Sequence, residues 1–476
     1  MKRGFSTIEL LIATALALMF LSAMYVVTFG DQSTILSGET NAEAVAKTQA
    51  LVEDQQAKGR QDFNLVNATS STDGIYTKKV TVNLLPDLLT KQVVASTTWK
   101  GNHNQTLNTT ITTLITNIDN ISAPNTCNST LTGDWTHPQI LAQISIDPSS
   151  KGGNGVDILN HRAYFTGDST SASKEDIYIY DVTDPANPIE LGKKNTGPGL
   201  KDVAVANINS NIYAFVANES NAVSTGQLQI VNVTNPTNIT FSNFSLTGLG
   251  IVTGSGSQAN GNSLFYKDGY LYLGLTKTAT GPNFVIIDVH TPTAPVYKGG
   301  FSIPNDINSI VVKGQYAYVA TPNNEGIKVL DVSNPANPVR VSGIDLVDHS
   351  ANGKSIYIVG STLYFGRTVG SGAAKEINFL NITQPTLDPL PIPFGNRDIS
   401  GSVNALVIRG NYAFLATGET NKEFQIWDIS NPSNMTFVAS LASPNNDDGT
   451  SMDCEGNYLF ESIYNKQGLM IIGPGS

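Results

Sequence analysis

Most of the chain after residue 138 repeats one short pattern, and this repetition restricts the fold more than any other feature. One unit is a strand of alternating apolar residues that ends in Asp or Asn and is followed by a turn containing proline. Successive Asp and Asn positions lie 43 to 56 residues apart. The six copies are IYIYDVTDP (177–185), LQIVNVTNP (228–236), FVIIDVHTP (284–292), IKVLDVSNP (327–335), INFLNITQP (377–385) and FQIWDISNP (424–432).

An aromatic-rich strand precedes each of these units, and a seventh copy of it, GNYLFESIY, starts at Gly456. Strands with a period of two residues, separated by turns within a unit of this length, predict a four-stranded blade. Seven such units predict a seven-bladed β-propeller. An open β-solenoid is the alternative that would use the same repeats.

The two ends of the repeat region indicate how a ring would close. The seventh unit ends at GLMIIGPG and lacks the strand that follows the proline turn in the other units. The segment 138–146 lies before the first unit and aligns with the outer strand of a later unit, APVYKGGFSI (294–303). If it supplied the missing strand, no sheet edge would stay open. We therefore expect residues 127–476 to form a propeller closed by strand 138–146.

The N-terminal segment, MKRGFSTIEL and onward, is a long apolar run. The 22 residues from Ile8 to Phe29 carry a single charge, that of Glu9. As a helix this run would be roughly 33 Å long, which is enough to cross a bilayer. A secretory signal peptide would have a shorter apolar core than this run. Burial of the Glu9 carboxylate in a membrane would be costly unless it paired with a cation.

This arrangement closely resembles the class III leader of type IV pilins and related pseudopilins. The resemblance implies that a prepilin peptidase cuts after Gly4 and methylates Phe5. It also implies that Glu9 pairs with the new N-terminal amine when the helix assembles among other pilin subunits. A plain membrane anchor with one snorkelling glutamate is the alternative. The matching residues are Lys2, Arg3, Gly4, Phe5, Thr7, Ile8, Glu9 and Leu10.

The expected fold class is an α+β pilin module followed by an all-β seven-bladed propeller. In this division, residues 1–4 are the leader peptide and residues 5–30 the transmembrane and assembly helix. Residues 31–126 are a pilin-like head, in which the N-terminal helix continues to a stop at Gly59 and packs on a small antiparallel sheet. The long N-terminal helix and this sheet together make the predicted pilin module.

The repeated unit resembles the LVIVD repeat family. Members of this family carry an apolar alternating strand, then Asp-Val-Ser/Thr-Asx-Pro, with a Tyr-Ala-Tyr-Val strand upstream. The copy nearest this pattern combines Tyr316-Ala317-Tyr318-Val319 with Asp331-Val332-Ser333-Asn334-Pro335. The resemblance implies a fold and an exported location, and it implies no reaction.

Two cysteines, Cys127 and Cys454, allow at most one internal disulfide. Cys454 falls on the expected innermost strand of the last blade, and Cys127 precedes the strand that would close it. In a four-stranded blade these two places share a face, so we expect a disulfide that staples the closure outside the cytoplasm. Free buried thiols are the alternative.

Other oxygen-rich positions have simpler interpretations. The acidic loop around Asp447 and Asp448, with Asp453 nearby, is a weak calcium candidate, and a solvated turn is the alternative. The Asp residues that end the repeated strands are expected to cap the following turns. They are Asp181, Asp288, Asp331 and Asp428. We find no catalytic motif and therefore expect no enzyme, and no cofactor beyond that possible calcium.

A formal charge of −11 gives the chain no general electrostatic hold on nucleic acid. Together these features predict a minor type IV pilin, placed at the filament tip, that displays a propeller for adhesion or surface recognition of a glycan or protein. The expected location is the inner membrane as a precursor and then the pilus at the cell surface. A minor pseudopilin of a type II-like secretion system, binding cargo through its propeller, is the alternative. A surface-displayed enzyme is less favoured.

Overall fold

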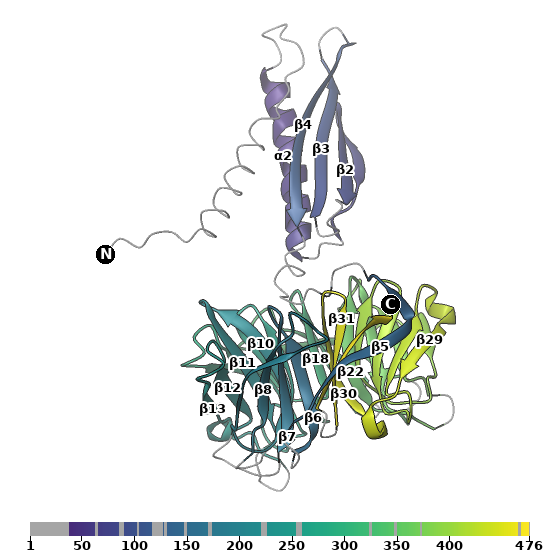
Figure 1. Cartoon of the computed structure of the whole chain (residues 1–476). Coiled ribbons are helices and arrows are strands. Elements are labelled where there is room, and N and C mark those ends of the chain that lie inside the picture. Colours follow the sequence, from purple (N-terminus) through teal and green to yellow (C-terminus); the bar gives the residue numbers. More distant parts are fainter. Residues whose placement is uncertain are drawn as a thin grey trace. The chain divides into compact units, whose positions relative to one another are not determined.

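The computed structural model describes residues 38–61, 65–84, 90–101, 104–116, 127, 131–146, 150–169, 174–219, 226–253, 259–322, 326–346, 350–371, 374–464 and 468–475. The chain divides into two compact units, residues 1–123 and 124–476 (Figure 1). Among the described residues, no helix is both long enough and apolar enough to cross a membrane.

The first unit is an antiparallel sheet with one helix, α2 (Gly38–Gln61), packed on it. Its strands are rich in Thr and Val, whose branched side chains favour a pleated sheet. Val52 of the helix joins Val80, Val93 and Ile115 of the sheet in a small apolar core. The strands, in their order across the sheet, are β1 (Thr69–Asp73), β2 (Tyr76–Leu84), β3 (Thr90–Lys100) and β4 (Thr106–Thr116).

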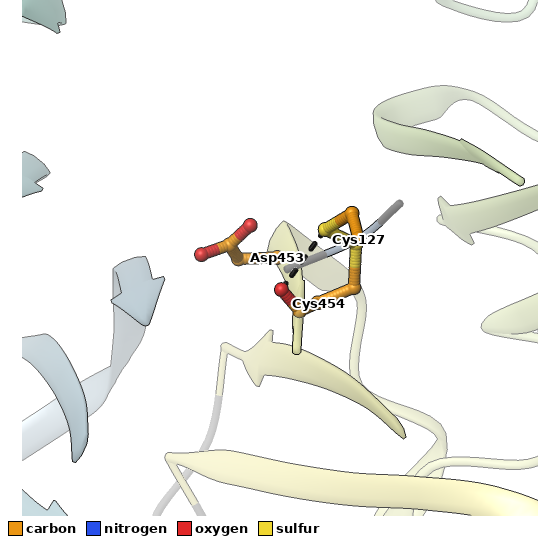
Figure 2. Close-up of side chains that lie close together, drawn as sticks. All are labelled: Cys127, Asp453 and Cys454. Atoms are coloured by element: carbon orange, nitrogen blue, oxygen red, sulfur yellow. Dashed lines mark hydrogen bonds between the residues drawn. A yellow bond between two sulfur atoms is a disulfide. The ribbon is translucent and has the colours of Figure 1, made fainter. Parts of the chain in front are cut away.

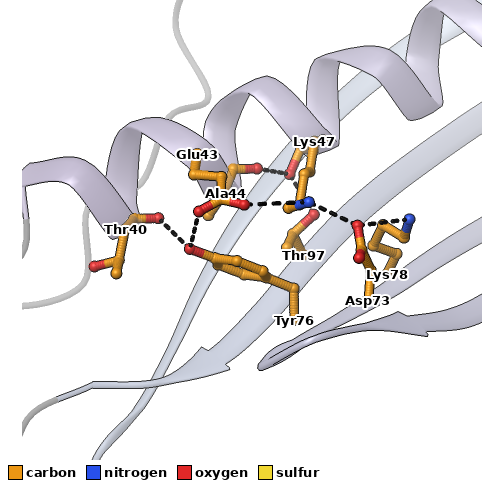
Figure 3. Close-up of polar contacts among 9 residues, drawn as sticks. Thr40, Glu43, Ala44, Lys47, Asp73, Tyr76, Lys78 and Thr97 are labelled. Carbon is orange, nitrogen blue, oxygen red and sulfur yellow. Dashed lines mark hydrogen bonds and ion pairs between the residues drawn. The ribbon is translucent and has the colours of Figure 1, made fainter.

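Polar contacts tie the first half of α2 to the sheet (Figure 3). The buried Thr48 hydroxyl donates to Thr97 Oγ1 at 2.7 Å. The Lys47 ammonium lies 2.6 Å from a carboxylate oxygen of Asp73, which sits at the end of β1. The Tyr76 hydroxyl donates to the carboxylate of Glu43. These contacts fix the helix against the strands at positions where the apolar core is thin.

The predicted fold class, with its long N-terminal helix and pilin module, is wrong for the described chain. The described residues form eight four-stranded sheets and a single α-helix, so their fold is nearly all β. The described helix starts only at Gly38, and the β-branched residues after it direct the unit toward strands. Gly59 is also no stop, because α2 runs to Gln61. A Cβ at Gly59 would approach Ile115 Cγ2 to 2.5 Å, so close helix–sheet packing explains the glycine.

The second unit is a β-propeller of seven four-stranded antiparallel blades. Blade 1 holds β6 (Ser150–Ile158), β7 (Arg162–Ser169), β8 (Ile177–Asp181) and β9 (Ile189–Lys194). Blade 2 holds β10 (Leu200–Ile208), β11 (Asn211–Asn218), β12 (Leu228–Asn232) and β13 (Thr240–Phe244). Blade 3 holds β14 (Gly261–Lys267), β15 (Tyr270–Leu275), β16 (Phe284–Asp288) and β17 (Val296–Phe301). Blade 4 holds β18 (Ser309–Lys313), β19 (Tyr316–Ala320), β20 (Ile327–Asp331) and β21 (Val339–Ile344).

The remaining blades follow the same plan. Blade 5 holds β22 (Gly353–Val359), β23 (Thr362–Arg367), β24 (Ile377–Asn381) and a short β25 (Gly395–Arg397). Blade 6 holds β26 (Val403–Arg409), β27 (Tyr412–Thr417), β28 (Phe424–Asp428) and β29 (Thr436–Leu441). Blade 7 holds β30 (Gly449–Glu455), β31 (Tyr458–Ile463), β32 (Leu469–Gly475) and β5 (Asp134–Ile144). The described residues also include the 3₁₀ turns η3 (Thr247–Leu249), η5 (Pro432–Asn434) and η6 (Pro444–Asn446).

The innermost strands form a closed ring, in which β30 of blade 7 lies against β6 of blade 1. The outermost strand of blade 7 is β5, which comes from the N-terminal side of the propeller and pairs with β32. In this pairing Ile144 lies opposite Leu469 and Ile140 opposite Ile472. Side chains from both faces of the blades fill apolar clusters between neighbours, and the largest fully buried ones include Tyr164, Tyr318 and Phe414.

The Asp residues at the ends of the repeated strands cap turns, as predicted. The carboxylate of Asp181 accepts a hydrogen bond from the Thr183 N–H at 2.9 Å, and that of Asp331 accepts one from the Ser333 N–H at 2.9 Å. Asp288 and Asp428 make the same contact two residues on. These side chains satisfy backbone donors that the turn would otherwise leave unpaired.

A second kind of side-chain contact recurs from blade to blade, and the repeat pattern of the sequence does not predict it. In several blades, a buried polar side chain just before the third strand accepts hydrogen bonds from backbone N–H groups near the end of the fourth. Asp176 accepts from Thr196, Asn283 from Ile303 and Glu376 from Ile399, and Glu423 accepts from Ser443. Burial removes the Asp176 carboxylate from water and so raises its pKa to about 7.

Candidate functional site at the closure of the propeller

Three consecutive residues of β30 reach out of blade 7 and join it to the start of the propeller. They are Asp453, Cys454 and Glu455, on the last half of the innermost strand. Side chains alternate along a strand, so Asp453 and Glu455 face blade 1 while Cys454 faces the opposite side. The junction where the ring closes thus has a disulfide at Cys454, a hydrogen-bonded carboxyl pair at Asp453 and a carboxylate–turn contact at Glu455.

Cys454 forms a disulfide with Cys127, across 327 residues of sequence (Figure 2). Their Cα atoms are 5.4 Å apart, a separation that a disulfide spans readily. Cys454 is completely buried, and it belongs to an apolar cluster with Trp135 of β5. The bridge therefore links the innermost strand of blade 7 to the segment that leads into its outermost strand.

Asp453 joins blade 7 to blade 1 through the backbone and through a second carboxyl group. Its Oδ2 accepts a hydrogen bond from the Ile158 N–H at 2.7 Å, and its side chain hydrogen-bonds that of Asp157. Asp157 in turn accepts from Val205 in blade 2, at 2.6 Å. Asp202 of blade 2 repeats the contact with Leu264 in blade 3, at 2.8 Å. Carboxyl groups thus connect the inner strands of four successive blades.

This arrangement holds a proton between two acids. Burial, with the charge of Asp453 next, raises the pKa of Asp157 well above its ordinary value. Burial also raises the pKa of Asp453 to about 6, and that of Asp202 to about 6. Two carboxyl groups in contact cannot both ionise cheaply, so Asp157 keeps its proton and donates it to Asp453. Because the Oδ2 atom of each carboxyl accepts a backbone N–H of the next blade, we interpret the pair as a junction between blades.

Glu455 completes the closure on the same strand. It is 7% exposed and accepts a hydrogen bond from the His161 N–H at 3.0 Å. The Nδ1 atom of the His161 ring lies 3.0 Å from its second oxygen. The turn at Asn160 and His161, in which both residues have positive φ, presents this N–H to the carboxylate.

The weak calcium candidate does not assemble as one site. Asp447 and Asp448 directly follow the 3₁₀ turn η6, whereas Asp453 lies on β30. In the part of the chain that the structure describes, the one group of three metal-binding side chains in mutual reach is Cys127, Asp453 and Cys454. Two of these are the sulfurs of the disulfide, so this group does not fit calcium, which prefers oxygen ligands. Gly4, Phe5 and Glu9 lie outside the described residues.

A further acid, Glu461 of β31, is buried between blades 6 and 7. It is fully buried, and among the described residues neither carboxylate oxygen has a hydrogen-bond partner. Burial, with the charge of Glu423 second, raises its pKa well above the ordinary value. The corresponding strands of blades 2, 3 and 4 carry apolar residues at this position, namely Val216, Leu273 and Val319.

Replacing Glu461 with leucine should therefore stabilise the propeller at pH 8. The gain should be about 1–3 kcal/mol, because an unpartnered buried carboxyl is replaced by a side chain that the site accommodates in other blades. Urea unfolding of the full chain at pH 8 measures it. The matched control is Glu423→Leu, which removes acceptors for Ser443 and Asn421 and should destabilise the chain. Equal losses of stability in both variants would contradict this interpretation of Glu461.

Fold and closure together define a repeat β-propeller with a covalent link at its closure. Residues 305–345 and 400–442 match the model of the LVIVD repeat, which supports the predicted repeat propeller. No curated protein matches the chain.

Several solved structures match this chain at low sequence identity. A chain of the mitotic checkpoint complex is 13% identical, with a TM-score of 0.48, and the match covers 72% of this chain and 94% of that one. A protein of Bacteroides uniformis, provisionally assigned as a 6-phosphogluconolactonase, is 11% identical, with a TM-score of 0.47 and coverage of 72% and 90%. A functionally unknown protein of Desulfotomaculum acetoxidans is 12% identical, with a TM-score of 0.41 and coverage of 68% and 100%. Likenesses of this extent carry no conclusion about activity.

Proposed function

We propose that this chain is a minor type IV pilin, located at the filament tip, whose propeller recognises a surface glycan or protein. The observation that carries the proposal is the presence, in one chain, of a class III leader pattern and a propeller with a disulfide at its closure. A disulfide between distant segments suits a protein that works outside the cytoplasm. A propeller of this size is difficult to place at every position of a shaft, which favours a rare subunit at the tip.

In this proposal the leader delivers the propeller to the surface. A prepilin peptidase removes residues 1–4 and methylates Phe5, and Glu9 then pairs with the N-terminal amine among other pilin subunits. The precursor resides in the inner membrane before assembly. The proposal needs no catalytic group, and the Asp157–Asp453 pair supports that choice because one oxygen of each carboxyl accepts a hydrogen bond from a backbone N–H of the next blade. A glycosidase would instead hold two carboxyl groups apart, on either side of a substrate bond.

Immunogold electron microscopy of intact cells, with an antibody against residues 138–476, tests this proposal. Label at filament ends is expected. Label spaced evenly along the shaft, at the abundance of a main subunit, would contradict placement at the tip. Label confined to the envelope, and seen only after permeabilisation, would instead support a pseudopilin of a type II-like secretion system that binds cargo through its propeller.

A further inference from the structure

A shallow groove of about 420 Å³ lies on the outer part of blade 5, next to blade 6. Its volume falls in the range of small-molecule sites. The groove runs from the start of β24 along the short strand β25, which has only three residues. It is lined by Lys375, Asn396, Arg397, Asp398 and Ser400.

The central cation of this groove is Arg397, and an aromatic ring supports it. Its guanidinium carbon lies 5.6 Å from the ring centroid of Trp427, which belongs to β28 of blade 6. The Trp427 Nε1–H donates to Gln425 Oε1 at 2.9 Å, and this bond fixes the ring. A guanidinium stacked on an aromatic face keeps its N–H donors, which lie in its plane, available for a planar anion.

The other charged side chains of the groove, Lys375 and Asp398, pair with each other, so the Arg397 guanidinium can bind an incoming anion. The carboxylate of Asp398 lies 3.5 Å from the Lys375 ammonium and also accepts a hydrogen bond from the Ser400 N–H. Within the described part of the chain, Arg397 forms no ion pair with a carboxylate. This free cation stands out in a chain whose formal charge is −11.

An exposed aromatic side chain outside the groove contacts the same tryptophan. Phe437 of β29 packs edge-on against Trp427, with ring centroids 5.6 Å apart, and is 47% exposed. The Lys422 ammonium lies 6.0 Å from the Phe437 ring centroid and adds a second cation nearby. An exposed ring and a guanidinium that both pack on Trp427 match a sugar that has both an apolar C–H face and a carboxylate.

We propose that this groove binds the uronic acid units of an acidic polysaccharide. The Arg397 guanidinium would take the sugar carboxylate through two N–H donors, and Phe437 would contact the C–H face of the ring. This inference rests on the proposed function in surface recognition, and it names the ligand class of that recognition.

The test measures binding of the full chain, in detergent, to tetramers of galacturonate, mannuronate and hyaluronan and to their methyl esters. Isothermal titration should show binding of at least one acid form, at least about tenfold tighter than its ester, because esterification removes the charge at nearly constant shape. Arg397→Ala should weaken binding by about tenfold or more, and Arg397→Lys should retain only part of it, since lysine lacks the planar fork. Lys193→Ala is the matched control, because it removes one positive charge from blade 1, where Lys193 pairs with Glu190, and should leave binding unchanged.

Three results would overturn this proposal. These are no binding of any acid tetramer, equal binding of acid and ester, and unchanged binding by Arg397→Ala while its melting temperature equals that of the wild type. The immunogold experiment above stays independent of this test. Label at filament ends combined with any of these results would retain the proposed display of the propeller and reject the uronate groove.

Discussion

Replacing Cys127 with serine should lower the free energy of unfolding of the propeller by about 2–5 kcal/mol. The bridge to Cys454 joins positions 327 residues apart, so its loss gives the unfolded chain much more conformational freedom. The segment that carries Cys127 makes another contact at the same place, since the Thr132 N–H donates to Asn457. We therefore expect a lower stability with the ring still formed. Urea unfolding of the full chain under non-reducing conditions measures the change.

Trp135 offers a local probe of this prediction, because it packs in the same apolar cluster as Cys454. Tryptophan fluorescence, to which Trp99 and Trp427 also contribute, should report unfolding at a lower urea concentration in Cys127→Ser than in the wild type. A reductant should shift the wild-type midpoint to that of the variant and leave the variant itself unchanged. Identical midpoints for both proteins in the absence of reductant would show that the bridge does not contribute in solution.

The propeller could be predicted because the same strand-and-turn pattern recurs in the sequence. Each copy of the unit, such as IKVLDVSNP, combines a strand pattern with a turn whose Asp caps the backbone, and both features are local in the sequence. The seven blades follow from counting these units. The unit before the repeats offered no such redundancy. For that unit the sequence predicts an N-terminal helix that continues in amphipathic form to Gly59 and packs on an antiparallel sheet. The described residues have a helix from Gly38 to Gln61 and four antiparallel strands, but not the long N-terminal helix of the predicted pilin module.

The carboxyl pair at the closure was missed because each acid is inconspicuous in its own strand. Asp157 and Asp453 occupy corresponding positions of β6 and β30, opposite Tyr164 and Phe460. Other blades carry residues such as Val311 there. Comparing the innermost strands position by position would have shown two acids in an otherwise apolar or aromatic column. Only the closed ring brings the two together, since they lie almost 300 residues apart.

The acidic loop shows the opposite relation between sequence and structure. Asp447, Asp448 and Asp453 are close in sequence, and oxygen ligands close in sequence are one sign of a calcium loop. In the structure, however, a strand separates Asp453 from Asp447 and Asp448, because Gly449 starts β30 and Asp453 lies four residues along it. A strand rises about 3.3 Å per residue, so Asp453 is carried away from the loop and into the junction with blade 1.

Replacing Asp157 with asparagine should make the stability of the propeller less sensitive to pH between 4 and 8. The folded state raises the pKa of Asp157 well above its ordinary value, so this group binds a proton that the unfolded chain releases near pH 4. The stability that this bound proton contributes is fully present below the pKa of Asp157 in the unfolded chain, and it is lost as pH rises through the pKa of Asp157 in the folded chain. The free energy of unfolding of the wild type should thus fall as pH rises. Asparagine does not titrate, and its amide can still donate to Asp453 and accept from Val205.

We expect the wild type to lose on the order of 2 kcal/mol more stability than Asp157→Asn between pH 4 and pH 8, measured by urea unfolding at each pH. The other titratable groups around the pair are Asp202, Glu455, Tyr164 and Tyr357, and all of them stay in place in the variant. The control is Asp428→Asn, because the Asp428 carboxylate caps a turn and its pKa is lowered, so it titrates below this interval. Parallel pH profiles for the wild type and Asp157→Asn would mean that the shared proton does not stabilise the closure. A profile flattened only by Asp157→Asn would place the pH sensitivity of the ring at the junction between its first and last blades.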